Sequence, residues 1–245
     1  MNARTSTGAT RVLFLGDSIT RAQISVDYVR ILKDRTAGGR YAFTNAGVNG
    51  DLAYNVLQRL DPVIRQQPDI VVVLIGSNDA NASLSEKNAL RMRKTKKLPG
   101  IPTIGWYEHN LATIAERLTK ETHARVALLS LPVLGQEPGS VPVRRSEEYS
   151  GVIKATAAEH GVTYLPLHER QIEHLQAHDH APRIPFRDGT ALAKRTAMRH
   201  FLLGQSFDSI SRRRGLELTT DFIHQNTRGA TMIADLIEDF LGDLA

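Results

Sequence analysis

The sequence predicts an α/β domain built on a parallel, doubly wound sheet. Apolar runs of strand length, such as 70–75, alternate with longer segments that have apolar residues at helical spacing, and this alternation continues through residue 165. The chain has 245 residues, 41% hydrophobic and 23% charged, which is typical of one globular domain with a sizeable core. We find no internal repeat, and we expect one domain over residues 1–245 with excursions at about 80–102 and 167–218.

The expected strands are short apolar runs bounded by turn-forming residues. In chain order they cover residues 11–15, 41–45, 70–75, 125–131 and 162–165. The run 70–75 is β-branched and uninterrupted, which is typical of a strand buried on both faces. Gly16 ends the first strand, Asn45 begins a turn with two glycines, and Pro132 ends the fourth strand.

The expected helices have apolar residues on one face, three or four positions apart. They cover residues 26–35, 52–65, 106–122, part of 141–160, 169–176, about 192–203 and about 227–241. Glycines at 38–39 and Pro68 end the first two. Residues 80–102 are polar and basic without a clear period, so we expect a long surface excursion there. Residues 167–218 keep only a loose pattern, which over this length is typical of a lid or a pocket wall.

The distribution of charge limits the partners of the chain. The net charge is +5, and residues 85–98 hold six basic residues and one acidic residue, so this segment alone accounts for it (6 − 1 = +5). A solvated surface fits this segment, and so does a site for an anionic substrate or a membrane surface. Nucleic-acid binding is not expected, because the segment has no interleaved aromatic residues and no recognised binding motif.

Apolar segments and cysteine usage limit location and chemistry. The longest apolar run, 70–75, is far shorter than the roughly 20 residues of a membrane helix, so no membrane insertion is expected. Residues 1–10 are polar and lack the apolar core of a signal peptide, which favours a cytoplasmic protein. The chain has no cysteine, which excludes disulfides, a thiolate nucleophile and cysteine-based zinc sites.

The segment 12–20 places a serine where open parallel sheets bind their ligands. Four apolar residues form the expected strand, Gly16 allows a tight turn, and Ser18 follows near the start of a helix. Ser18 could be only a helix cap, because aspartate, serine and threonine are the usual capping residues. Three later segments favour a nucleophile instead.

The segment 219–226 supplies the groups that a serine nucleophile needs. A neutral imidazole can take the proton of a serine hydroxyl near pH 7, and His224 is the candidate base. The imidazole needs a carboxylate on its other nitrogen, and Asp221 precedes it by three residues. The alternative is a loop pair that is bonded only to backbone.

The tetrahedral intermediate of acyl transfer needs hydrogen-bond donors aimed at its oxygen. The candidates are the backbone N–H groups of Ser18 and Gly50 and the side-chain amide of Asn78. Gly50 has no side chain to keep a substrate away from its amide. Taken singly, Gly50 could be only a turn and Asn78 only a helix cap, and it is the ordered combination that is specific.

Four segments in this order resemble the blocks of the SGNH hydrolases, also called the GDSL esterase/lipase family. They are Gly16-Asp17-Ser18-Ile19, Asn45-Ala46-Gly47-Val48-Asn49-Gly50-Asp51, Gly76-Ser77-Asn78-Asp79 and Asp221-Phe222-Ile223-His224. Two positions depart from the usual pattern: Ile19 stands where leucine is more usual, and Gln225 stands where proline or leucine often follows the histidine. The resemblance covers 11–79 and 219–241 well and says little about the two excursions.

The resemblance implies a flavodoxin-like three-layer α/β/α fold with sheet order 2-1-3-4-5. It also implies hydrolysis of small-molecule carboxylic esters through an acyl-enzyme, without metal or cofactor. The implied site has Ser18, Asp221 and His224 as the catalytic triad and Ser18, Gly50 and Asn78 as the oxyanion hole. An acyltransferase or a carbohydrate deacetylase would use the same site, and a non-catalytic binding protein could use the same scaffold.

Substrate choice is expected to reside in the excursion 167–218, whose ends lie at the catalytic edge of the sheet. Phe201 and Phe207 could line an apolar pocket, or they could simply bury a peripheral helix. With Asp17 they are the candidates for substrate contact. Because the candidate wall is short, we expect acyl chains from acetyl to about hexanoyl to be favoured.

One cluster of side chains offers a competing interpretation as a metal site. It consists of His174, His178, Asp179 and His180, of which the first two are one helical turn apart. The cluster leads into a proline-containing loop, and no second group of ligands stands out in the sequence. We therefore expect a polar surface or a pocket rim there rather than a metal.

Overall fold

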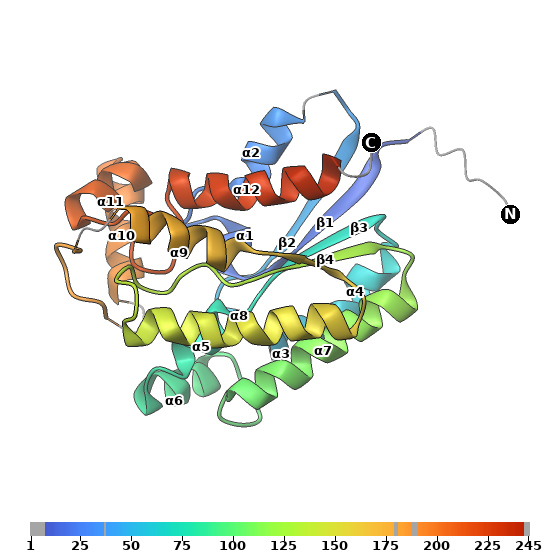
Figure 1. Ribbon diagram of the computed structural model, residues 1–245, viewed down its shortest axis with the longest axis horizontal. Helices are drawn as coiled ribbons and strands as arrows, with labels where there is room; N and C mark the ends of the chain where they lie inside the picture. Colours follow the sequence, from blue (N-terminus) through green and yellow to red (C-terminus); the bar gives the residue numbers. More distant parts are fainter. Residues whose placement is uncertain (1–7, 37, 179–180, 188–190, 243–245) are drawn as a thin grey trace, which may run out of the picture.

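The structure is a computed structural model that describes residues 8–36, 38–178, 181–187 and 191–242. A five-stranded parallel sheet lies between two layers of helices, and its strand order is β2-β1-β3-β4-β5 (Figure 1). The strands are β1 (Thr10–Gly16), β2 (Tyr41–Gly47), β3 (Ile70–Leu74), β4 (Arg125–Leu129) and β5 (Thr163–Leu165). The predicted fold class and the sheet order implied by the resemblance are both confirmed.

The helices cover both faces of the sheet and its carboxyl edge. They are α1 (Ser18–Arg21), α2 (Tyr28–Arg35), α3 (Ala53–Gln58), α4 (Leu60–Arg65), α5 (Ser77–Ala82), α6 (Glu86–Thr95), α7 (Ile104–Glu121), α8 (Val141–Glu159), α9 (Leu167–Ala177), α10 (Ala191–Leu203), α11 (Phe207–Arg214) and α12 (Thr227–Gly242). In Figure 1, α2, α9 and α12 lie on one face of the sheet, and α3, α4, α7 and α8 lie on the other. Helices α10 and α11 stand at the left-hand end, where the strands finish.

The central strand β3 separates two hydrophobic cores. Its side chains alternate, so that Val71 and Val73 belong to the core under α3, α4, α7 and α8. Ile70, Val72 and Leu74 belong to the core under α2 and α12. All five side chains are buried, and each contributes about 1.5–3 kcal/mol relative to exposure. This burial on both faces explains why the strand reads as an uninterrupted apolar run.

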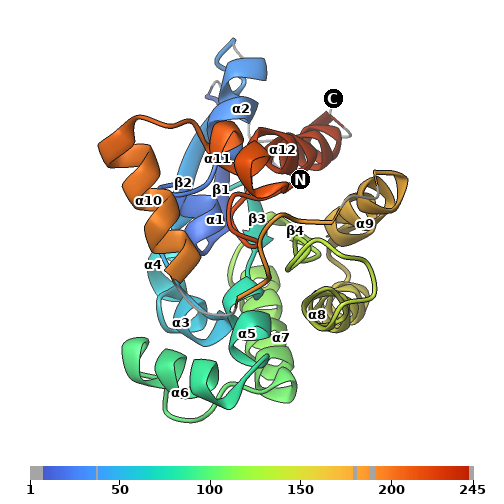
Figure 2. The same cartoon turned by 90° about the vertical axis from the view of Figure 1, so that its left-hand side faces the viewer.

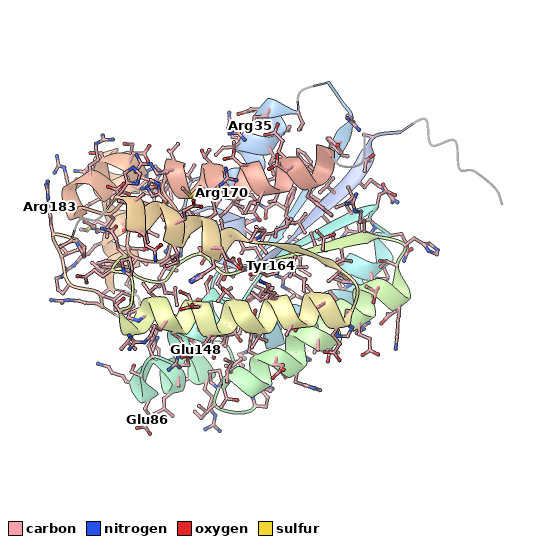
Figure 3. The ribbon with its side chains drawn as sticks, viewed as in Figure 1. Arg35, Glu86, Glu148, Tyr164, Arg170 and Arg183 are labelled. Carbon is pink, nitrogen blue, oxygen red and sulfur yellow. The ribbon has the colours of Figure 1, made fainter. Side chains whose placement is uncertain are left out.

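Charged side chains on the surface connect α12 to its two neighbours. Arg35 of α2 contacts Asp235 at 2.8 Å and Glu238 at 2.9 Å, and Arg170 of α9 contacts Asp235 at 3.2 Å. Figure 3 labels both arginines, which approach α12 from different helices. Such partly exposed pairs contribute little to stability, and burial of the apolar face of α12 outweighs them.

Two segments differ from the expected elements. Residues 52–65 form two helices rather than one, because Arg59 leaves the helical conformation and its side chain donates to Asp51 Oδ2 at 2.8 Å and to the Gly16 carbonyl at 3.0 Å. The expected surface excursion at 80–102 is wrong in part, because it contains the end of α5 and all of α6. Buried side chains there pack in part against Leu52, and they are Ala80, Ala82, Ala89, Met92 and Leu98.

The carboxyl edge of the sheet contains a topological switch point. The chain leaves β1 for β2 on one side and later returns to β3 on the other side of β1. Loops after neighbouring strands therefore diverge at this point, and open α/β sheets bind their ligands in the resulting crevice. Ser18 begins α1 directly after β1, and Asn78 lies in the first turn of α5 after β3.

Candidate active site

Ser18 is the first residue of α1, directly after the turn that ends β1. Asp17 caps this short helix, and its Oδ1 accepts from the N–H of Ile19 at 2.9 Å. Gly16 is required in the turn, because a Cβ atom there would lie 2.2 Å from Thr20 Oγ1 and 2.5 Å from the Leu74 carbonyl. Asp17, and not Ser18, is therefore the residue that caps α1. The Ser18 hydroxyl can bond to other partners.

Ser18, His224 and Asp221 form a continuous chain of hydrogen bonds. Ser18 Oγ lies 3.0 Å from His224 Nε2. On the other side of the ring, His224 Nδ1 lies 2.9 Å from Asp221 Oδ2 and 3.1 Å from Oδ1. Ser18 and His224 are 7% and 6% exposed, so the hydroxyl and the ring are shielded from bulk water without being sealed. The structure brings together the three side chains that the sequence singled out.

A tight turn fixes the imidazole on its carboxylate. The His224 N–H donates to Asp221 Oδ1 at 2.9 Å, and the Thr220 N–H donates to the His224 carbonyl at 2.7 Å. Phe222, between them, has a φ of +74°, a left-handed conformation that is strained for a bulky residue. The hydrogen bonds of the turn hold Phe222 in this strained conformation, and the turn keeps the Asp221 carboxylate beside the His224 ring.

Burial and charge shift the pKa values of His224 and Asp221 in opposite directions. Burial by itself lowers the pKa of His224, but the charge and hydrogen bond of Asp221 outweigh it and raise the pKa above 6.5. Burial by itself raises the pKa of Asp221, but the charge of His224 and three hydrogen bonds lower the pKa below 3.8. The pair therefore favours a protonated imidazole beside an ionised carboxylate.

Gly50 lies in a left-handed turn between β2 and α3. Its φ is +73°, which glycine adopts without strain, and a Cβ atom there would meet only the Lys96 side chain at 3.7 Å. Gly47 is different, because a Cβ atom there would lie 2.4 Å from the Arg21 nitrogen of α1. The structure thus gives Gly47 a packing role and leaves Gly50 as the candidate oxyanion donor.

The Asn78 side-chain amide reaches the segments that follow β1 and β2. Its Nδ2 donates to the Asp51 carbonyl at 3.0 Å and to Asp17 Oδ2 at 3.1 Å. These bonds identify the nitrogen end of the amide, because an amide oxygen would repel both acceptors. Both of its hydrogens have acceptors in the protein, so an oxyanion would have to compete with one of them.

Three charged side chains, which sequence reasoning missed as parts of the site, hold the Gly50 turn in place. Asp51, 3% exposed, accepts from Arg59 Nε at 2.8 Å and from Lys96 Nζ at 2.7 Å. Lys96 also donates to the Asn49 carbonyl at 3.0 Å and so contacts both neighbours of Gly50. No signal marked Lys96, because it is one of six basic residues between positions 85 and 98.

Two further carboxyl groups are buried beneath the site. Burial raises the pKa of Asp17 to about 6, although the Ile19 N–H and the charge of His224 lower it. Burial also raises the pKa of Asp79 well above its usual value, although its Oδ2 accepts from the Ala53 N–H at 3.2 Å. Both groups therefore carry a cost of ionisation near neutral pH.

The predicted substrate-contact phenylalanines surround one histidine. The Phe207 ring stacks on His200 with centroids 4.1 Å apart, and the Phe201 ring meets His200 edge-on at 4.9 Å. Phe201 is 63% exposed. Phe186 lies elsewhere and packs on Phe222, with centroids 5.5 Å apart. It lines an open cavity of about 450 Å³ beside the turn that carries Asp221, together with Leu84, Val141, Pro142 and Arg187.

Two of the four side chains in the predicted histidine cluster lie within the described residues. His174 and His178 stack with ring centroids 4.1 Å apart, and His174 Nε2 lies 3.5 Å from Glu217. Asp179 and His180 lie outside the described residues. Among the residues described, no group of three histidine, aspartate or glutamate side chains is placed to hold a metal. In the same residues, no helix has the length and apolar character to cross a membrane.

A three-layer α/β/α fold with these side chains at the carboxyl edge of its sheet is typical of ester-hydrolysing enzymes. The model of the GDSL-like lipase/acylhydrolase family matches residues 14–231, and the chain belongs to this family. It is thus an enzyme that acts on ester bonds. No curated protein matches the chain.

Solved structures of similar fold include several esterases. The α/β hydrolase LAE5 from the metagenome of Lake Arreo, Spain, is 20% identical and has a TM-score of 0.68, over 97% of this chain and 98% of that one. The acetylxylan esterase Axe2 from Geobacillus stearothermophilus is 18% identical, with a TM-score of 0.65 over 96% and 95% of the two chains. The acetyl xylan esterase AlAXEase is 19% identical, with a TM-score of 0.64 over 94% and 98%.

Proposed function

We propose that the protein is a serine esterase that hydrolyses carboxylic esters through an acyl-enzyme on Ser18. The observation that carries the proposal is the unbroken hydrogen-bond chain from Ser18 Oγ through His224 to Asp221. In the similar esterase Axe2, variants at a serine, at a histidine and at an aspartate three residues before it are described as catalytic mutants. The spacing of Asp221 and His224 is the same.

The geometry supports a two-step reaction. Ser18 Oγ attacks the ester carbonyl carbon while His224 Nε2 takes its proton, and the carbonyl oxygen becomes an oxyanion. The oxyanion is held by the N–H groups of Ser18 and Gly50 and by Asn78. As the tetrahedral intermediate collapses, the ester C–O bond breaks and His224 returns the proton to the departing alcohol. Water then attacks the acyl-enzyme, again with His224 as base, and releases the acid and the free serine.

Labelling at the serine tests this proposal. A fluorophosphonate should form an adduct on Ser18 that mass spectrometry locates, and Ser18→Ala should abolish both the adduct and ester hydrolysis while the far-UV circular dichroism stays unchanged. Ser25, which is buried and bonded to the Gln225 backbone, gives the matched control Ser25→Ala, which should keep the adduct on Ser18. An alanine variant at position 18 with near-native turnover would contradict the proposal, and a chain without any adduct would favour a binding protein.

We further propose that short acyl chains are preferred and that the cavity beside Phe186 receives them. The cavity is open, and four of its five lining residues are apolar, so each additional methylene gains contact only until that apolar wall ends. Phe186→Ala should shift the optimum in a series of esters from acetyl to palmitoyl without changing turnover of the acetyl ester. Phe207→Ala tests the alternative wall on α11, and a shift in that variant alone would move the acyl site there.

Two further activities belong in the same assay. Acetylated sugars should be tested as substrates, because two of the similar structures are acetylxylan esterases. An alcohol acceptor should be tested as well, because the same acyl-enzyme can pass its acyl group to an alcohol instead of water.

A further inference from the structure

The end of α10 presents an apolar surface that the enzyme's chemistry does not explain. The three most exposed large apolar side chains of the described residues are consecutive there: Phe201 at 63%, Leu202 at 77% and Leu203 at 61%. Met198, one helical turn earlier, is 51% exposed. We call these four side chains the α10 patch. A contiguous exposed patch of this kind marks an interaction site in soluble proteins.

The opposite side of α10 is anchored to the candidate active site. Leu192 and Thr196 are buried, and Thr196 Oγ1 accepts from Arg214 Nη1 at 2.8 Å. The same Arg214 nitrogen donates to the Thr220 carbonyl at 2.5 Å, next to Asp221. The helix is therefore held with one face against the site and the other outward. Figure 2 looks onto the carboxyl edge of the sheet and shows α10 at that edge.

The charges around the patch define its partner. Residues 181–207 contain five arginine and lysine residues and one aspartate, so their formal charge is 5 − 1 = +4. Lys194 and Arg195 are exposed one turn before Met198, and Figure 3 shows Arg183 at the same end of the molecule. Exposed apolar side chains beside lysine and arginine are typical of helices that lie on anionic lipid surfaces.

A second copy of the chain is a poorer occupant. In a twofold dimer the patch would meet itself, so the interface would gather Lys194 and Arg195 of both copies. Residues 191–203 contain no acidic residue that could balance them. Like charges at such an interface oppose association.

We propose that the α10 patch docks the enzyme on an anionic lipid surface. Phe201, Leu202 and Leu203 enter the boundary between headgroups and acyl chains, while Lys194 and Arg195 contact anionic headgroups. The helix lies in the interface and does not span the membrane. Because α10 stands at the edge that carries Ser18, docking turns the candidate active site toward the lipid. The proposal concerns binding alone and does not depend on the proposed esterase activity.

Flotation of the full chain with vesicles tests the docking. The chain should float with vesicles of phosphatidylcholine containing about one third phosphatidylglycerol, should bind phosphatidylcholine alone much more weakly, and should be released as NaCl rises from about 0.1 M to about 0.5 M. Leu202→Glu should weaken binding at least about tenfold, because it places a charge in the apolar boundary. Arg195→Glu should weaken binding to the anionic vesicles in particular.

Leu90→Glu is the matched control. Leu90 is 48% exposed on α6, and its substitution changes the net charge by the same amount, so this variant should bind like the unaltered chain. Hydrolysis of a water-soluble acetyl ester should be equal in all these variants, and Ser18→Ala should still float. Equal loss of binding in Leu90→Glu and Leu202→Glu would overturn the proposal, as would an absence of flotation. A dimer in solution that Leu202→Glu converts to a monomer would identify the patch as an interface between copies instead.

Discussion

At the scale of single residues, the Asn78 amide is held more tightly than an isolated donor would be. Its Nδ2 donates to Asp17 and to the Asp51 carbonyl, and in the proposed mechanism the oxyanion takes one of these two hydrogens in the transition state. Asn78→Ala should lower kcat by about 10²–10³ and leave KM nearly unchanged. Steady-state kinetics on an acetyl ester measure both quantities. A loss confined to KM would show that Asn78 only positions the substrate.

In the proposed mechanism, the pKa of His224 sets the pH dependence of ester hydrolysis. The base must be neutral to accept the Ser18 proton, and Asp221 raises the pKa of the imidazole above 6.5 despite burial. Activity should therefore be low in acid and rise with pH, with the midpoint of kcat/KM above pH 6.5. Asp221→Asn should move that midpoint downward, because the attraction to the carboxylate is gone, and should lower turnover greatly. Full activity at pH 5, or loss of activity with a chelator, would contradict this assignment.

At the scale of elements, α6 has a role beyond the surface. The residue just past its end, Lys96, bonds to Asn49 and Asp51 on either side of Gly50, so the position of α6 sets the position of a candidate oxyanion donor. Lys96→Met should lower kcat about tenfold, because a small displacement of a donor is enough to weaken it. Lys94→Met, an exposed lysine of α6, is the control and should have no effect. If the Lys96 variant lost thermal stability but kept its kcat, the network would be structural only.

Elements with a strong apolar pattern could be predicted from the sequence, and weakly patterned ones could not. β3 and α12 were predicted to within a residue or so, because burial on two faces or one face dictates their apolar residues. α6 was missed because only Asn88, Ala89 and Met92 are buried in it, and they alternate with exposed Leu90 and basic side chains. α11 has only Phe207 and Ile210 as apolar residues and was missed for the same reason.

The residues of the candidate site could be predicted from local motifs, but the contacts that hold them in place could not. Ser18, Gly50, Asn78 and the 221–224 segment each carry a recognisable spacing, so their order along the chain sufficed to find them. The contacts that hold them, such as those of Lys96, join residues that are more than 40 positions apart. No sequence period encodes such contacts, because they depend on how complete helices pack.

At the scale of the whole molecule, stability and the candidate site share buried carboxyl groups. Burial raises the pKa of Asp79 in the folded state above its unfolded value, so the folded state binds the proton more tightly and stability falls as pH rises through that interval. Asp79→Asn removes this penalty and can still accept from the Ala53 N–H. The gain in melting temperature of this variant over the unaltered chain should be larger at pH 8 than at pH 4. Each kcal/mol of added free energy of unfolding corresponds to about 2–4 °C.

Asp61→Asn is the control, because its effect on stability should change with pH in the opposite direction. A hydrogen bond from Arg117 lowers the pKa of this exposed carboxyl group, so the ionised form is favoured by folding and its contribution is lost as pH falls. This variant should be slightly less stable than the unaltered chain at pH 8 and equal to it well below pH 4. Parallel pH profiles for both variants would contradict the assignment to Asp79.

The hydrogen bond between Ser18 and His224 joins residues that are 206 positions apart. Closing so long a loop is entropically costly, so the pair can form only after the intervening sheet and helices have assembled. During refolding, the fluorescence of Trp106, the chain's one tryptophan, should report α7 as it packs near Tyr54 in the middle of the sequence. Regained ester hydrolysis should report the arrival of the last loop. In the proposed mechanism, Ser18 therefore gains its base only after residues 219–226 have folded against the end of β1.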